Sequence, residues 1–281
     1  MTLRLDSHQH FWRFNPVEYG WIDDSMSALR RDFLPEDLAP LAAAQQIDGA
    51  IAVQARQTLE ETDWLLSLAQ QHPSLVRGVV GWAPIASKGF PHILRRLRSN
   101  NALKSLRHIV QAEPDGFLLQ PNFQRGIAAL RETGLVYDIL ITARQLPEAI
   151  TFVDANPQQV FVLDHIAKPD LRSLALEPWA TQIRDLARRP NVYCKLSGMV
   201  TEADWHNWTS AQLQPFYENV LEAFTPRRLM AGSDWPVCTV AASYESWWQI
   251  VHSWIASLSE TEQAEILGDT AASVYQITPA S

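Results

Sequence analysis

Residues 3–10 read Leu-Arg-Leu-Asp-Ser-His-Gln-His, and this stretch decides between two folds. Its apolar start is typical of a short buried strand, and its polar end marks the point where the chemistry would begin. In a doubly wound open sheet that binds a dinucleotide, a glycine-rich turn follows the first strand. Here His8-Gln9-His10 stands in that place, which favours a closed barrel over the open sheet.

Seven further short apolar runs follow along the chain. They are rich in Val, Ile and Leu and mostly lack strict alternation, a pattern typical of parallel strands that are covered on both faces. The predicted strands span residues 3–6, 50–54, 76–82, 103–107, 135–140, 160–164, 192–196 and 228–232.

Amphipathic stretches separate these runs and predict helices. They span residues 35–46, 59–71, 90–98, 123–133, 146–155, 179–188, 213–224, 244–258 and 260–275. Eight strands alternating with helices, in 281 residues, match the ~250 residues typical of a (β/α)8 barrel. We therefore predict an α/β fold, a (β/α)8 TIM barrel in which residues 1–281 form a single domain.

Composition excludes several classes of protein. Lys plus Arg number 23 and Asp plus Glu 31, a net charge of −8, so no basic surface for nucleic acid is expected. Apolar residues make up 47%, which is too many for a disordered chain. No run of about 18 uncharged apolar residues predicts a membrane span. The start of the chain lacks a secretory signal pattern, and Cys194 and Cys238 are too few for a disulfide scaffold, so we expect a cytoplasmic protein with reduced thiols.

Polar and ionisable residues gather where the predicted strands end, which in a barrel is the face that carries the active site. Burying such groups without partners is costly, so a ring of them indicates a ligand, a metal or mutual pairing. These residues are His8, His10, Gln54, Arg56, Trp82, Arg107, His108, Asp138, Asp164, His165, Lys168, Lys195, Ser233, Asp234 and Trp235.

The strongest constellation within this ring is His8, His10, His165 and Asp234. Residues two apart on an extended segment point to the same side, so His8 and His10 address one point. Neutral imidazoles either ligate Zn²⁺ or donate hydrogen bonds to a developing oxyanion. For His8-x-His10 alone a packing role is the alternative, and for Asp234 the alternative is a helix cap.

Asp234 is the natural general base, because a carboxylate beside a polarised carbonyl can take a proton from water. The chain contains no Gly-x-Ser-x-Gly elbow, and Ser197-Gly198 lacks the first glycine. Both cysteines stand in apolar surroundings typical of packed thiols. An acyl-enzyme route is therefore disfavoured.

Basic and aromatic residues at the strand ends supply candidate substrate contacts. Arg107, Lys195 and Arg56 would donate to oxygen-rich groups, with a salt bridge as the alternative for each. The chain also has an excess of tryptophans, eleven in all; many of them would pack in the core, and a few would wall a pocket for a ring-shaped ligand. Those of residues 244–258 would either form a dimer patch or pack on the barrel.

Five segments resemble the amidohydrolase-2 branch of the amidohydrolase superfamily, and within it the lactonase group that acts on L-fucono- or L-rhamnono-lactone. The resemblance runs nearly end to end. It is carried by residues 6–12 (Asp-Ser-His-Gln-His-Phe-Trp), 105–111 (Ser-Leu-Arg-His-Ile-Val-Gln), 163–169 (Leu-Asp-His-Ile-Ala-Lys-Pro), 195–198 (Lys-Leu-Ser-Gly) and 232–236 (Gly-Ser-Asp-Trp-Pro).

The resemblance implies a TIM-barrel hydrolase that opens a sugar lactone with activated water. Asp234 would activate the water, while His8, His10 and His165 would polarise the carbonyl. The residues expected to line the substrate are Arg107, Lys195, Gln54, Trp82, Trp235 and His108.

The resemblance also bears on cofactors. The superfamily's two-metal site uses a Lys after the fourth strand and a His after the fifth, where this chain has Arg107-His108 and Asp138. We therefore expect no required cofactor; a single divalent ion such as Zn²⁺, if bound, would use His8, His10, His165 and Asp234.

Two other functions stay open at this point. One is a metal-dependent non-oxidative decarboxylase of the same branch, and the other is a barrel that binds carbohydrate without chemistry. The expected partner is a small sugar lactone, and a homo-oligomer built on exterior helices is left open.

Overall fold

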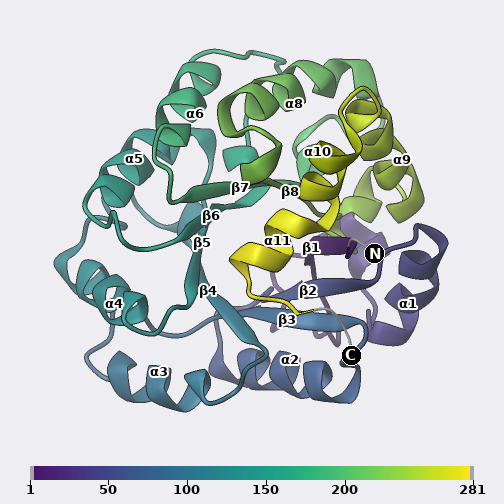
Figure 1. Ribbon diagram of the computed structural model, residues 1–281. Coiled ribbons are helices and arrows are strands. Elements are labelled where there is room, and N and C mark those ends of the chain that lie inside the picture. Colours follow the sequence, from purple (N-terminus) through teal and green to yellow (C-terminus); the bar gives the residue numbers. More distant parts are fainter. Residues whose placement is uncertain (1–2, 279–281) are drawn as a thin grey trace.

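The eight strands form one parallel sheet in chain order, as the computed structural model, which describes residues 3–278, shows in Figure 1. Each neighbouring pair from β1–β2 to β7–β8 is hydrogen-bonded in parallel. The strands are β1 (Leu5–Gln9), β2 (Gly49–Val53), β3 (Val76–Gly81), β4 (Leu103–Ile109), β5 (Val136–Leu140), β6 (Phe161–Leu163), β7 (Val192–Leu196) and β8 (Leu229–Ala231).

The sheet closes between its last and first strands through a few backbone bonds just beyond β8. Gln9 bridges Trp235, the His10 N–H donates to the Trp235 carbonyl at 2.7 Å, and the Asp234 N–H donates to the His8 carbonyl at 2.7 Å. Buried Asp6 adds to the closure by accepting from the Ser233 N–H (2.8 Å) and hydroxyl (2.6 Å). The predicted (β/α)8 barrel is confirmed.

Helices surround the barrel (Figure 1). Pro35, Pro91, Pro121 and Pro147 stand in the first turns of four helices, where Pro is tolerated. The helices are α1 (Pro35–Ala44), α2 (Leu59–Gln71), α3 (Phe90–Arg98), α4 (Pro121–Arg131), α5 (Leu146–Asp154), α6 (Trp179–Ala187), α7 (Met199–Glu202), α8 (Ser210–Phe224), α9 (Tyr244–Ile255), α10 (Glu260–Ala264) and α11 (Thr270–Val274).

Two elements differ from their predicted bounds in ways that matter for the site. β1 runs to Gln9 rather than residue 6, because its pairing with β2 continues to Ala52. The helix predicted over residues 260–275 is divided by a π-helical turn, Glu265–Asp269. Gly268 in that turn lies against the chain's start, where a Cβ would come 1.7 Å from the Leu3 carbonyl oxygen.

The barrel interior is filled from one end by the C-terminal segment. Figure 1 shows α11 lying across the centre of the ring of strands. Val274, Tyr275 and Ile277 pack there in one apolar cluster with inward side chains of the strands. The partners of this cluster on the strands are Leu5, Ile51, Val53, Val80, Val136, Val162 and Met230.

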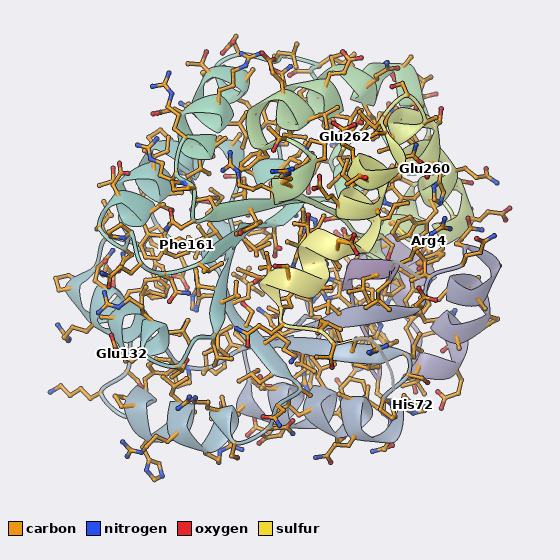
Figure 2. All side chains as sticks on the ribbon, in the orientation of Figure 1. Arg4, His72, Glu132, Phe161, Glu260 and Glu262 are labelled. Carbon is orange, nitrogen blue, oxygen red and sulfur yellow. The ribbon has the colours of Figure 1, made fainter. Side chains whose placement is uncertain are left out.

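Outside the barrel, the large side chains of α9 pack inward. Trp247, Trp248 and Trp254 are all buried within the chain, so these side chains pack on the barrel and are not exposed as a dimer patch. The Trp247 Nε1 donates to the Gly232 carbonyl at 2.7 Å. In Figure 2, charged side chains such as Glu132 and Glu260 reach the periphery while Phe161 stays inside. Cys194 and Cys238 are buried thiols, as expected. In residues 3–278, every helix is too short or too polar to cross a bilayer.

The contact between α4 and the loop after β3 yields a stability prediction. A Cβ on Gly126 would lie 2.2 Å from the Ile85 carbonyl oxygen, which is backbone and cannot move aside cheaply. Alanine normally stabilises a helix interior over glycine, yet Gly126→Ala should lower the unfolding free energy by about 1–3 kcal/mol. Urea denaturation measures this change. Gly20→Ala, which meets no atom within 4 Å, is the control and should stay within about 0.5 kcal/mol of the parent; equal stabilities of the two variants would contradict the packing argument.

Candidate active site

Three side chains from the first and last strands converge at the carboxyl end of the barrel. The Nε2 atoms of His8 and His10 lie 3.2 Å apart. Oδ1 of Asp234 lies 3.8 Å from His8 Nε2 and 3.3 Å from His10 Nε2. All three side chains are buried, and Asp234 faces the imidazoles instead of capping a helix. The predicted convergence of these residues is therefore present.

His165 completes the group from the other side of the barrel. It sits in η4 (Asp164–Ala167), where residues 165–168 all have positive φ between 45° and 62°. Such left-handed backbone costs roughly 1–2 kcal/mol per L-residue, and strain of this kind collects at functional sites. Its Nδ1 pairs with the Ser197 hydroxyl at 2.9 Å and its Nε2 lies 3.9 Å from Asp234 Oδ1. Gly198 makes room for the ring, since a Cβ there would lie 2.4 Å from His165 Nδ1.

A layer of four buried charges lies beneath His8. The Arg107 guanidinium donates to Asp164 Oδ2 at 2.7 Å, and the Lys195 ammonium lies 3.0 Å from Asp164 Oδ1 and 2.5 Å from Asp138 Oδ2. Arg107 and Lys195 are almost wholly enclosed. The structure thus gives both residues carboxylate partners inside the barrel, and their predicted contact with substrate stays a prediction.

The electrostatics of the site favour neutral His8 and His165 imidazoles beside an ionised Asp234. Burial and the Lys195 ammonium hold the pKa of His8 well below its usual value, and burial lowers the pKa of His165 to about 4. Burial alone would raise the pKa of Asp234, but the facing His165 and His10 outweigh it and lower that pKa. Neutral imidazole nitrogens and an ionised carboxylate are the forms that ligate a metal ion and accept a proton.

The other predicted substrate residues occupy different depths. Trp82 Nε1 donates to His108 Nδ1 at 3.3 Å, and both side chains are only partly buried. Trp235 is buried against Phe33, with ring centroids 5.3 Å apart. Gln54 is also buried, and its amide nitrogen lies 3.5 Å from the Arg107 carbonyl. Trp82 and His108 are therefore partly open to solvent, while Trp235 and Gln54 lie behind the surface.

A groove of about 590 Å³ lies among the loops that follow β1 and β2. One side comes from the long loop after β1 and the other from the loop after β2, the start of α2 and the end of β4. Its lining residues are Glu18, Gly20, Trp21, Ala55, Arg56, Gln57, Thr58, Glu60 and Ile109. Arg56 is paired with Glu18 at 2.5 Å, which confirms the salt-bridge alternative for this residue.

Comparison with known proteins identifies the family. The sequence profile described as Amidohydrolase matches residues 5–277. This chain belongs to the amidohydrolase family.

Two curated relatives of this amidohydrolase have named activities. An L-fucono-1,5-lactonase from Burkholderia multivorans is 41% identical over 290 residues, with 98% of this chain and 97% of that protein covered. An L-fucono-1,5-lactonase from Burkholderia ambifaria is 33% identical, with 99% and 97% covered. A crystal structure of an amidohydrolase from Burkholderia multivorans with bound Zn has a TM-score of 0.94 and 41% identity, covering 98% of this chain and all of that one.

We expected that no cofactor is required. The zinc in that crystal structure contradicts this expectation, which was wrong. The expectation relied on the missing second-site Lys and His, and their loss does not remove the ligands of a single ion. In this amidohydrolase, His8, His10 and Asp234 offer ligand atoms within 4.8 Å of one another, and so do His8, Asp164 and His165. The Val53 carbonyl accepts a hydrogen bond from the His10 Nδ1–H at 2.8 Å, which leaves Nε2 free to ligate.

The sequence analysis did not predict the role of the residues that hold the site in place. Ser197 fixes the His165 ring, and Asp164 joins Arg107, Lys195 and His8. Asp164 was visible as a carboxylate at a strand end, but its partners depend on which side chains point inward. Glu61 on α2 gave no signal at all, because it is one acid among several in an amphipathic helix.

Glu61 anchors the loop after β2 and generates a pH prediction. Its buried carboxyl accepts from the backbone N–H groups of Ala55 (2.9 Å) and Arg56 (2.7 Å) and from the Tyr19 hydroxyl (3.2 Å). Burial raises the pKa of Glu61 from 4.5 to about 7. The folded protein then holds a proton that the unfolded chain releases, so this group's contribution to stability is present below pH 4.5 and is lost as the pH rises through 7.

Glu61→Gln removes this titration while keeping an oxygen for the two backbone donors and an amide for the Tyr19 oxygen. The difference in unfolding free energy, variant minus parent, should therefore rise between pH 5 and pH 8, by ~3 kcal/mol at most. Urea denaturation across that range measures it, with Glu60→Gln on the exposed face as the matched control. A difference that does not change with pH would contradict the assignment.

Proposed function

We propose that this amidohydrolase opens the ester bond of a sugar-derived lactone to give the aldonic acid, with L-fucono-1,5-lactone as the substrate to test first. The main support for this proposal is the 41% identity to an L-fucono-1,5-lactonase across essentially the whole of both chains. The buried group formed by His8, His10, His165 and Asp234 supports it, since it offers polarising groups and a base at one point.

We further propose that the amidohydrolase binds one divalent ion such as Zn²⁺. His8, His10 and Asp234 would hold it, with His165 as the neighbouring imidazole. Two nitrogen ligands and one carboxylate leave a position open, as catalytic zinc sites do. When bound, the ion supplies Lewis-acid polarisation of the lactone carbonyl and a lower pKa for water at the site.

Asp234 is the proposed general base. Its pKa lies below the usual value, so the carboxylate is ionised at neutral pH. It takes one proton from the attacking water as oxygen adds to the carbonyl carbon. It then returns that proton to the ring oxygen as the C–O bond breaks, so the product is a hydroxy acid and the enzyme is restored. No covalent bond to the protein forms.

The mouth of the barrel supports a neutral polyol rather than a diacid. Arg56 is compensated by Glu18 at 2.5 Å and lies 3.7 Å from Glu61, so it is not free to bind a carboxylate. Trp82 and half-exposed Trp21 offer aromatic faces on which a sugar ring lies well. We propose that the lactone hydroxyls reach the groove that Trp21 lines.

A pH-stat measurement tests the function directly, because lactone opening releases acid. L-fucono-1,5-lactone should give acid release well above the rate of the buffer blank, and other sugar lactones should rank below it. Rates equal to the blank for every sugar lactone tried would overturn the proposed function.

Substitution of the base gives a sharper prediction. Asp234→Asn keeps the shape of the side chain but cannot accept the proton, so kcat should fall by about 10²–10⁴-fold. Circular dichroism and the melting temperature check that the fold is retained. Asp154→Asn, on the exterior helix α5, is the matched control and should keep parental kcat; a similar kcat for Asp234→Asn would remove Asp234 from this role.

Metal removal gives an independent prediction. Dialysis against a strong chelator should abolish most lactone hydrolysis, and stoichiometric Zn²⁺ should restore it, because an open zinc site stabilises charge that develops on the carbonyl oxygen. Mass spectrometry of the metal content on the same samples measures occupancy. Full turnover by a sample that holds almost no divalent ion would contradict the proposed ion site.

A further inference from the structure

The C-terminal segment reaches into the charged layer beneath the site. Tyr275, which follows α11, is buried in the end of the barrel opposite the mouth. Its hydroxyl donates to Asp138 Oδ2 at 2.8 Å, and its ring lies 5.6 Å from the Lys195 ammonium. In Figure 1 this segment crosses the centre of the strand ring, so it plugs the barrel and also touches its innermost polar group.

Asp138 connects Tyr275 to residues nearer the mouth of the barrel. Its Oδ1 accepts from the Ser105 hydroxyl at 2.6 Å, and its Oδ2 lies 2.5 Å from the Lys195 ammonium. The same ammonium lies 3.3 Å from His8 Nδ1, on the edge of the ring opposite the nitrogen that faces Asp234. One unbroken line of contacts therefore joins Tyr275 to His8.

We propose that Tyr275 is a positioning residue: its hydroxyl fixes Asp138, Asp138 fixes the Lys195 ammonium, and Lys195 with Asp164 sets the orientation of the His8 ring. This inference rests on the proposed function for its kinetic readout, but its binding readout is independent of the substrate.

Loss of the Tyr275 hydroxyl should affect His8 because each contact between them is short and closed to solvent. Lys195 and Asp138 have no exposed surface, so water cannot take the place of a lost partner. Asp164 Oδ1 lies 3.4 Å from His8 Nδ1 and 3.0 Å from the Lys195 ammonium, so a shift of the ammonium changes both contacts of that nitrogen. Partners that orient a ligating imidazole usually contribute 10–100-fold to metal affinity or activity.

The test uses Tyr275→Phe in the full-length protein, which deletes one oxygen and keeps the ring. Tyr217→Phe is the matched control, because it also deletes a buried hydroxyl hydrogen bond, here to the Trp254 carbonyl at 3.2 Å on the exterior helices. Three quantities are measured for each protein: the Kd for Zn²⁺ by competition with a chromophoric chelator, kcat and KM for L-fucono-1,5-lactone, and the melting temperature.

Tyr275→Phe should weaken the Kd for Zn²⁺ and lower kcat, each by about tenfold, while KM stays within about twofold. The control should lose a comparable amount of melting temperature and change neither quantity. A Tyr275→Phe protein that matches the control in Kd and kcat would overturn the inference, since a purely structural hydroxyl predicts that result.

Ser105→Ala keeps the inference falsifiable if Tyr275→Phe does not fold. It removes a second hydroxyl donor to Asp138 without touching the C-terminal segment, and it should shift the Kd for Zn²⁺ in the same direction. An unchanged Kd would overturn the route through Asp138. If the parent protein binds Zn²⁺ but hydrolyses no lactone, the proposed function fails while the Kd comparison still decides the role of Tyr275.

Discussion

The hydrogen bond from the Asp234 N–H to the His8 carbonyl, 2.7 Å long, is the constraint on which the site depends. It joins the first strand of the barrel to the segment after the last one. It therefore places the Asp234 carboxylate beside the imidazoles of His8 and His10, which point to the same side of their segment. Asp234 adopts a φ of 57° to make this bond while its side chain turns inward. The strain is offset by the buried Asp6–Ser233 bonds, which close the same seam from below.

Below that seam, the barrel interior holds a compensated set of charges in addition to its apolar cluster. Arg107 and Lys195 face Asp138 and Asp164 with no exposed carboxylate surface. Removing one member of such a set costs about 3–5 kcal/mol, because the remaining charge is buried without a partner. Burial and the Lys195 ammonium of this set hold the pKa of His8 low, so the same interior prepares a neutral imidazole to ligate an ion.

Sequence patterns predicted the strands, their parallel order and the residues at the site, because a barrel brings the carboxyl ends of all its strands to one face. His8, His10, His165 and Asp234 could be grouped on that rule alone. The contacts of Arg107 and Lys195 could not, since they depend on register and on which side chains turn inward. The left-handed turn at residues 165–168 contains no glycine, so the sequence did not predict its positive φ angles. The cofactor expectation was wrong because the sequence shows which ligands are missing from a second ion site but not how well three neighbouring donors hold one ion.

Anomalous X-ray diffraction at the zinc edge, from crystals of the zinc-saturated protein, tests the central claim most directly. We predict one anomalous peak per chain, within ligand distance of His8 Nε2, His10 Nε2 and Asp234 Oδ1, about 2.0–2.2 Å. A peak elsewhere on the chain, or none at this point after saturation, would contradict the account of how the first and last strands build this site.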